Sequence, residues 1–235
     1  MPRTIPAERF SQLIDVSTRT FVARGYRLTQ MSDVASALGV AKGTLYGYVR
    51  SKEALFDAAV RFADGLGTEP DVGELPLPTP DEGSTVRYVQ SRLMEEVRDL
   101  ELARVLSEPA GTRATEGEFE RIVRDLYRRM LRNRRALKLI DRCAVDHPEL
   151  AAVWFEQGRY GQVGLLAAYL ERRGEAGDVR AAPNVQLAAR MVLETIALWA
   201  IHMPWDPAPH PLPEVEVEDA VADLLVHAYE RERPR

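Results

Sequence analysis

The chain has 235 residues, of which 46% are hydrophobic and 29% are charged, and its formal net charge is −5 at pH 7. This length allows one mid-sized domain, or a small domain joined to a larger one, with a sizeable core. A single cysteine, Cys143, excludes an intrachain disulfide and a four-cysteine zinc site. The longest charge-free apolar stretches have eleven residues, against roughly twenty needed to span a bilayer, and no secretory signal is evident. We therefore expect a cytoplasmic protein without a transmembrane helix.

Charge is distributed unevenly along the chain. Residues 1–62 hold nine Lys or Arg and five Asp or Glu, a net charge of +4, whereas the remainder carries −9. A basic N-terminal unit on an acidic body is expected when only one end of a protein meets a polyanion. We expect a DNA-binding domain over 1–62 and a helical ligand-binding and dimerisation domain over 63–235.

Apolar residues recur at helical spacing along nearly the whole chain, and alternating strand patterns do not occur, so the sequence predicts an all-α protein. The N-terminal helices are expected over about 7–24, ended by Gly25; over a short segment capped by Thr29 or Ser32 and closing at Gly39; over about 42–48; and after Ser51, which caps the fourth. This gives a three-helix head and a fourth helix that leads out of it.

The rest of the chain begins with a loop at 67–83, where four prolines and several glycines interrupt the pattern. Further helices are expected from Ser84, over 118–132, over 134–145, from an Asp146–Glu149 capping box to about Arg173, over 184–203 and over 215–231. The complete prediction is a helix-turn-helix head with a larger helical body, about nine or ten helices in all.

One segment has the spacing of a helix-turn-helix. Residues 31–50 read MSDVASALGVAKGTLYGYVR, with Ala35 fifth, Gly39 ninth and Leu45 fifteenth in this window. A small residue is needed at Ala35 because the second helix crosses there, and Gly39 permits the positive φ of a tight turn. The second helix would then present its N-terminal turn to a major groove.

The residues expected to face the duplex are short, polar or aromatic, and are Lys42, Gly43, Thr44, Tyr46 and Tyr48. Lys42 can reach a guanine edge or a phosphate, and Thr44 a thymine methyl group or a phosphate. Tyr46, Tyr48 and Lys52 suit phosphate oxygens, and Thr29 is a further phosphate candidate. A similar turn between short helices also occurs in proteins that never touch DNA, so the turn by itself leaves both interpretations open.

The run GVAKGTLYGYVRSKEALF, residues 39–56, resembles the signature of the TetR family of bacterial transcriptional repressors. The resemblance covers about residues 7–62. It implies a DNA-binding head, a divergent all-α body that dimerises through its last two helices, and an effector pocket in that body. It also places Lys42, Gly43, Thr44 and Tyr46 at groove contacts and Thr29, Tyr48 and Lys52 at phosphate contacts. Gly47 and Val49 depart from the family pattern, which often has bulkier residues there.

Beyond residue 62 the pattern of apolar residues carries the prediction. The two last expected helices are apolar enough to form a four-helix interface in a twofold homodimer, although they could also complete the core of a monomer. The candidate effector-binding residues are bulky or polar side chains on apolar helices: Tyr127, Met130, Trp154, Phe155, Tyr160, Trp199, His202 and Met203. Their apolar character favours a hydrophobic or aromatic effector, although such residues more often fill a core.

The sequence contains no phosphate-binding loop, nucleophile elbow, paired carboxylates or histidine pair with metal-ligand spacing, so we expect no enzyme, cofactor or metal. The leading hypothesis is a dimeric repressor that binds a palindromic operator in double-stranded DNA and is released by a small molecule. The alternative is a helical ligand-binding or scaffold protein without sequence-specific DNA binding. Activation in place of repression stays open, because the sign depends on the position of the operator.

Overall fold

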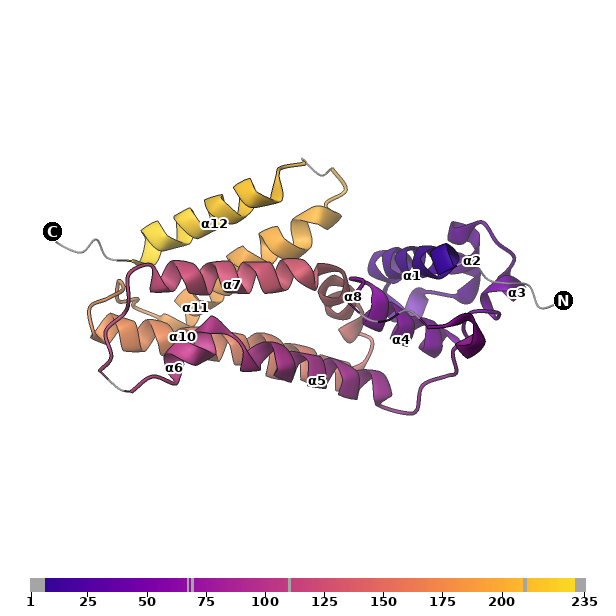
Figure 1. The fold of residues 1–235 in the computed structure, drawn as a ribbon, viewed down its shortest axis with the longest axis horizontal. Coiled ribbons are helices and arrows are strands. Elements are labelled where there is room, and N and C mark those ends of the chain that lie inside the picture. Colours follow the sequence, from indigo (N-terminus) through magenta and orange to yellow (C-terminus); the bar gives the residue numbers. More distant parts are fainter. Residues whose placement is uncertain (1–6, 67, 69, 110, 209–210, 231–235) are drawn as a thin grey trace. The chain divides into compact units, whose positions relative to one another are not determined.

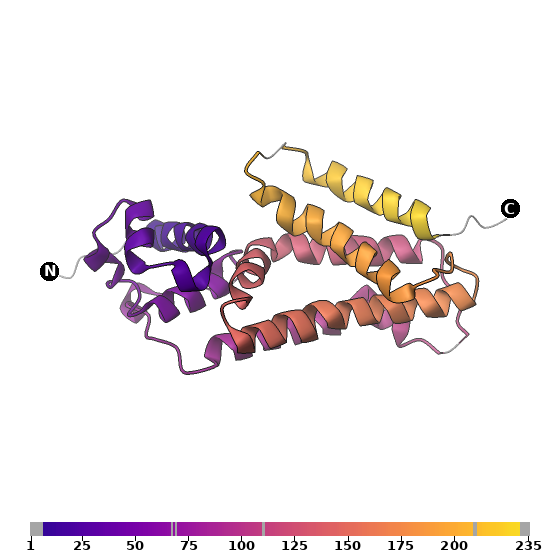
Figure 2. The same ribbon diagram turned by 180° about the vertical axis from the view of Figure 1, so that it is seen from behind.

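The computed structural model describes residues 7–66, 68, 70–109, 111–208 and 211–230. Within these ranges the regular elements are helices, together with two isolated bridges, Val49 with Leu77 and Val179 with Glu230 (Figures 1 and 2). The all-α prediction is therefore confirmed. The outer limits of the expected domains, residues 1 and 235, lie outside the described ranges.

The chain folds into two compact units. Unit 1 comprises Met1–Gln90 and Asn133–Trp154, and unit 2 comprises Ser91–Arg132 and Phe155–Arg235. The packing division thus differs from the expected division at residue 62, because the start of α5 (Ser84–Arg98) and the segment 133–154 belong with the N-terminal helices. Whether DNA binding itself is confined to residues 1–62 stays a prediction.

Unit 1 begins with the helices α1 (Ala7–Leu28), α2 (Met31–Leu38), α3 (Lys42–Leu45) and α4 (Lys52–Phe62). Gly25 does not end α1 as expected. It has φ 80° and ψ 167° and kinks the helix, which resumes to Leu28. Glycine suits this kink because L side chains rarely adopt a φ of 80°.

The caps of these helices are partly as predicted. The N-cap residue of α2 is Gln30, in place of the expected Thr29 or Ser32. The backbone N–H of Gln30 donates to the Asp33 carboxylate over 2.8 Å. Gly39 closes α2 in the left-handed conformation with φ 71°. Ser51 caps α4 as expected, since its hydroxyl accepts from the Ala54 N–H over 3.1 Å.

Two later helices, α8 (Arg134–Ala144) and α9 (Pro148–Ala151), complete unit 1, and α8 packs against α1 and α4. The Asp64 carboxylate caps α8 by accepting the N–H groups of Arg135 over 2.9 Å and Ala136 over 2.8 Å. The N-cap of α9 is His147, followed by Pro148, so the expected Asp146–Glu149 capping box does not form. Asp146 accepts the Arg27 N–H over 3.0 Å instead, which joins the end of α1 to this segment.

The regular elements that remain include a short turn in unit 1, η1 (Val72–Glu74), and α5 (Ser84–Arg98), which runs from unit 1 into unit 2. Unit 2 then has α6 (Glu101–Leu106), α7 (Glu118–Arg132), η2 (Ala152–Tyr160, from Phe155 on), α10 (Gly161–Glu175), α11 (Val185–Ala197), η3 (Leu198–His202), η4 (Met203–Trp205) and α12 (Glu214–Tyr229). The short α6 is absent from the sequence prediction. Both ribbon views show α12 alongside α7, and α10 packs against α11 (Figures 1 and 2).

The segment Val185–Trp205 is long and apolar enough, by length and composition, to cross a membrane. It also carries Arg190 and Glu194, which form an ion pair at 2.7 Å. Its first part, α11, packs against α10 and α7, and the buried face includes Val192 and Ile196, both 0% exposed. One face of α11 therefore lies in the core of unit 2, and the absence of a transmembrane helix stays an expectation.

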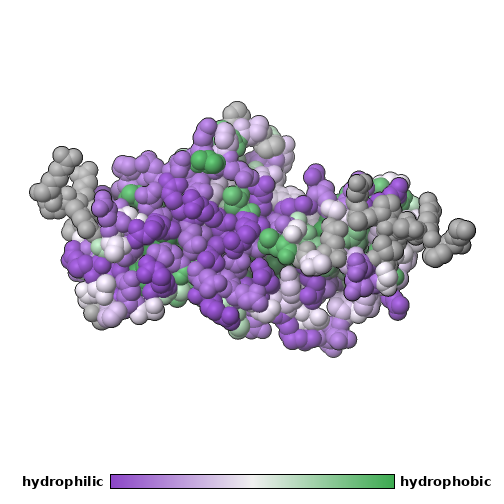
Figure 3. Space-filling view, viewed as in Figure 1, coloured by the Kyte–Doolittle hydropathy of each residue, from purple (hydrophilic) through white to green (hydrophobic). Residues whose placement is uncertain are grey.

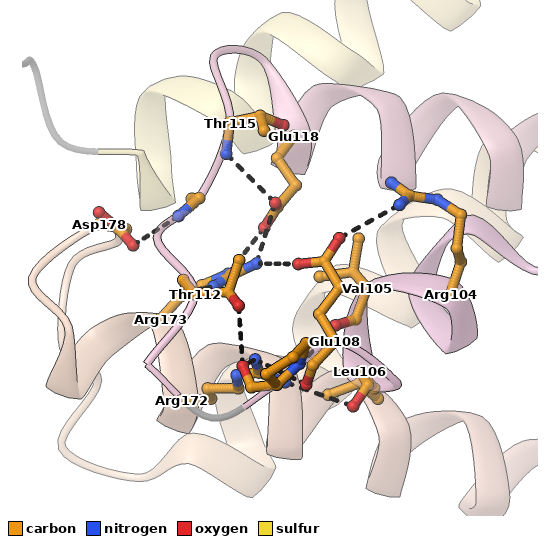
Figure 4. Close-up of polar contacts among 12 residues, drawn as sticks. Arg104, Val105, Leu106, Glu108, Thr112, Thr115, Glu118, Arg172, Arg173 and Asp178 are labelled. Atoms are coloured by element: carbon orange, nitrogen blue, oxygen red, sulfur yellow. Dashed lines mark hydrogen bonds and ion pairs between the residues drawn. The ribbon is translucent and has the colours of Figure 1, made fainter.

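A buried ion pair connects the start of α7 to the end of α10 (Figure 4). The side chain of Arg173 is 0% exposed, and its Nε and Nη2 lie 2.7 Å and 2.9 Å from the two carboxylate oxygens of Glu118. Arg173 also donates to the Thr112 carbonyl, and the adjacent Arg172 donates to the carbonyl oxygens of Leu106 and Glu108. The two arginines therefore fasten the loop between α6 and α7 to α10.

On the face drawn in Figure 3, hydrophilic side chains gather over α7 and α5. Glu96 of α5 pairs there with Arg129 at 3.1 Å and with Arg132 at 2.9 Å, both from α7. Arg124 of α7 pairs with Asp219 of α12 at 2.7 Å. These arginines are held by carboxylates of unit 2, so α7 is not a free basic surface despite its arginine content.

Candidate nucleic-acid interface

The segment that begins at Met31 folds as two short helices joined by a tight turn. Val34 and Leu45 are 0% exposed and Ala35 is 3% exposed, so the contact between α2 and α3 is closely packed. The turn is closed by the N–H of Gly39, which donates to the Ser36 carbonyl over 3.1 Å, and by that of Val40, which donates to the Ala35 carbonyl over 3.0 Å. The crossing predicted from the spacing is therefore present.

Four of the five residues expected to face a duplex are exposed, and we call them the α3 face: Lys42, Gly43, Thr44 and Tyr46. The Tyr46 side chain is 43% exposed, and the space beside Gly43 is open. None of the described residues pairs with the Lys42 ammonium group. The α3 face thus presents the Lys42 ammonium group, the Thr44 hydroxyl and the Tyr46 phenol. Between them, Gly43 lets the backbone approach a partner closely.

Tyr48 differs from the expectation that it faces outward with the α3 face. Its residue is only 5% exposed, and the neighbouring Val49 is 0% exposed. Because α3 ends at Leu45, the chain after Tyr46 no longer follows the helical rotation assumed for 42–48. The ring of Tyr48 therefore belongs to the core of unit 1.

The other two residues expected at phosphates also make internal contacts. Thr29 is 1% exposed, and its hydroxyl donates to the Gly25 carbonyl over 2.7 Å. The Lys52 ammonium group donates to the carbonyl oxygens of Tyr26 over 3.1 Å and Thr29 over 3.2 Å, and lies 4.3 Å from the centroid of the Tyr26 ring. In this structure Thr29 and Lys52 fix the junction between α1 and α2 from the start of α4.

The loop before α5 adds a contact that the sequence does not reveal. The Leu77 N–H donates to the Tyr48 carbonyl over 2.8 Å, and the Arg50 N–H donates to the Leu77 carbonyl over 2.9 Å. The Thr79 hydroxyl donates to the Ser51 hydroxyl over 2.9 Å. The loop before α5 is therefore hydrogen-bonded to the connection between α3 and α4. Its prolines and glycines predict only a loop.

The expected effector-binding residues occupy different environments. Tyr127 is 2% exposed and Met130 is 8% exposed on α7, which packs against η3. Trp199, His202 and Met203, on or next to η3, are half-buried, and so are Trp154 and Phe155, whereas Tyr160 is 58% exposed. In unit 1, the Trp154 Nε1 donates to the Asp141 carboxylate over 3.0 Å.

A pocket of about 460 Å³ in unit 1 is lined by other residues, among them Tyr26, Phe56 and His147. None of the eight expected effector-binding residues contributes to its wall. Within the described ranges, no group of three or more His, Cys, Asp or Glu side chains could hold a metal ion.

Comparison with known proteins identifies the N-terminal segment. Residues 13–59 match the family model described as "Bacterial regulatory proteins, tetR family". Among curated proteins, the HTH-type transcriptional repressor KstR2 of Rhodococcus jostii is 39% identical over 59 residues. That match covers 25% of this chain and 29% of the relative. The family model thus matches residues 13–59, and the chain spans less than a third of the length of this relative.

Solved structures resemble the chain over nearly its whole length. The ketosteroid transcriptional regulator KstR2 of Mycobacterium tuberculosis has a TM-score of 0.59 at 17% identity and covers 99% of this chain and 100% of its own. SCO3833 of Streptomyces coelicolor, a member of the TetR transcriptional regulator family, has a TM-score of 0.54 at 24% identity, covering 96% and 92%. At these identities the likeness concerns the fold.

Proposed function

We propose that this chain is a member of the TetR family of bacterial regulatory proteins and a dimeric, ligand-responsive transcriptional repressor that binds a palindromic operator. The observation that carries the proposal is the α3 face. It is exposed at the second helix of a closely packed helix-turn-helix, and Lys42 at its start has no described partner. We propose that the α3 face enters the major groove, where Lys42 reaches a guanine edge or a phosphate.

Thr29, Tyr48 and Lys52 take a supporting part in this proposal. Their side chains hold the kinked end of α1, the connection after α3 and the start of α4 in place. Substitutions at these three positions would then weaken DNA binding through the geometry of the head. Lys52 has a third ammonium hydrogen, so a phosphate contact by this residue is compatible with its two carbonyl bonds.

The proposed homodimer rests on exposed apolar side chains of α11, η3 and α12. Leu187 and Met191 are 53% and 56% exposed, Leu198 is 45% exposed, and Val215 and Leu224 are 71% and 59% exposed. Exposed apolar side chains on two neighbouring helices suit a twofold interface, in which the same residues contribute from both subunits. Two heads then read two half-sites.

The dimer is tested by placing a charge on this face. Met191→Glu combined with Leu224→Glu should convert the protein to a monomer in sedimentation equilibrium and abolish operator binding. Met94→Glu is the matched control, because Met94 is 60% exposed on α5. A double variant that remains dimeric contradicts the proposed interface.

We further propose that a hydrophobic or aromatic effector binds in unit 2, where α7 carries Tyr127 and Met130 and packs against η3. Such an effector releases the operator by stabilising a body conformation in which the two heads no longer match the half-site spacing. Regulators of this kind act in the bacterial cytoplasm and catalyse no reaction, and we propose the same for this chain.

Selection from a pool of random duplexes tests the DNA-binding function. The purified protein should enrich a palindrome, and its affinity should fall steeply with salt, because phosphate contacts release counterions. Failure to enrich any sequence, with ligand binding retained, would favour the alternative of a helical ligand-binding protein without sequence-specific DNA binding.

A further inference from the structure

The pocket of unit 1 is formed by four segments: the end of α1, the start of α4, the residues around the start of α5, and the start of α9. Its volume of about 460 Å³ falls in the range of small-molecule sites. The pocket lies entirely within unit 1 and is separate from the residues proposed for the effector in unit 2.

Three rings form the apolar part of the wall. The centroid of the Tyr26 ring lies 5.1 Å from that of Phe56 and 4.1 Å from that of His147, and the Phe56 and His147 rings are 5.7 Å apart. Pro80 and Leu150 extend this wall. A flat or branched hydrocarbon group could pack here without leaving polar groups unpaired.

Tyr26, Glu53 and His147 also bring polar groups to the pocket. The Tyr26 hydroxyl donates to the Glu53 carboxylate over 3.1 Å, which holds that carboxylate beside the rings. His147 Nε2 is buried and has no hydrogen-bond partner among the described residues. Burial is the main cause that lowers the pKa of His147, which disfavours the charged form of its ring.

The charge of the lining has one sign. Glu53, Asp81, Glu82 and Glu149 line the pocket, whereas no Lys or Arg is among its lining residues. Two described cations lie beside the lining: Lys52 donates to the carbonyl oxygens of Tyr26 and Thr29, and Arg87 donates to the Glu82 carbonyl over 3.0 Å. Carboxylates around an apolar wall produce a negative potential that attracts a cation and repels an anion.

We propose that this pocket binds a small organic cation, whose apolar body packs on Tyr26 and Phe56 and whose ammonium group faces the carboxylates. The site goes beyond the proposed function, because it concerns a second ligand in the unit that carries the α3 face. It does not depend on whether the head binds DNA.

The test compares three probes that share a phenylethyl body and differ in charge at pH 7: 2-phenylethylamine, 2-phenylethanol and 3-phenylpropanoate. Ligand-observed NMR titrations should show binding of the amine, at least about fivefold weaker binding of the alcohol, and no binding of the anion. An amine that fails to bind, or that binds no more tightly than the alcohol, overturns the proposal.

Variants locate the site. Glu53→Gln and Glu149→Gln should each weaken amine binding about threefold to tenfold and leave alcohol binding unchanged, because each removes one charge from the wall. Glu156→Gln is the matched control, since Glu156 is an exposed acid of unit 2 outside the pocket. If Glu53→Gln unfolds the protein, Glu149→Gln decides, because Glu149 is exposed. Equal effects of Glu149→Gln and Glu156→Gln contradict the assignment.

Discussion

The ion pair between Arg173 and Glu118 provides a stability test of unit 2 (Figure 4). Glu118→Ala removes the carboxylate whose two oxygens lie 2.7 Å and 2.9 Å from the guanidinium group, while Arg173 stays 0% exposed. The Thr112 carbonyl and Glu108, 3.4 Å away, are the other partners that the structure shows for Arg173. Glu118→Ala leaves the buried guanidinium group with the more distant Glu108 carboxylate, and loss of one partner of a buried pair costs about 3–5 kcal/mol.

For a chain of this size, each kcal/mol lowers the melting temperature by roughly 2–4 °C, so Glu118→Ala should lower it by roughly 6–20 °C. Thermal unfolding followed by circular dichroism measures this shift, and urea unfolding measures the free energy. Glu116→Ala is the control, because Glu116 is exposed on the same loop and should change the free energy by less than about 0.5 kcal/mol.

A double variant separates the charge from the packing. Glu118→Leu with Arg173→Met should recover part of the loss, because neither charge is then buried alone. A change of less than about 1 kcal/mol for Glu118→Ala, or a double variant less stable than Glu118→Ala, would refute the reasoning.

Two further predictions concern unit 1. Cys143 is 0% exposed and burial raises its pKa to about 12, so a thiol reagent should label it only after unfolding; rapid labelling of the native protein at pH 8 would contradict the packing of α8. Burial lowers the pKa of His147, near Lys52, Glu53 and Asp146, so the unfolded chain takes up the proton first as the pH falls below about 6.5. The free energy of unfolding should therefore decrease as the pH falls from about 6.5 through the pKa of His147 in the folded protein. Urea titrations of His147→Gln should lack this part of the pH dependence. Glu53 adds a further decrease at lower pH, because its pKa is also lowered, chiefly by a backbone hydrogen bond.

The helix-turn-helix could be predicted from sequence because each requirement falls on one residue. Ala35 is small where α3 crosses, Gly39 takes a positive φ, and Leu45 fills the core, all within one window. Periodicity also located most of the helices. The extent of α3 could not be predicted, because the break after Leu45 depends on the loop at Leu77, which lies far along the chain. This break is why Tyr48 is buried.

The sequence also could not predict which helices pack together in unit 1. Helix α8 joins the head through Asp64, which caps it, and through Cys143, which packs under α1 at Phe21. Neither contact has a local signature, because the partners are separated by about seventy and about one hundred and twenty residues. The division of the chain at residue 62 followed charge and family resemblance, and both concern the surface proposed to bind DNA more than they concern packing.

The central claim is that the α3 face meets a duplex, and the affinity of Lys42→Ala for a selected operator tests it most directly. Fluorescence anisotropy at fixed salt should show a loss of about 1–3 kcal/mol relative to the wild type. Arg180→Ala removes the same charge from an exposed position in unit 2 and should bind as the wild type does. Equal affinities of Lys42→Ala and Arg180→Ala would contradict the account.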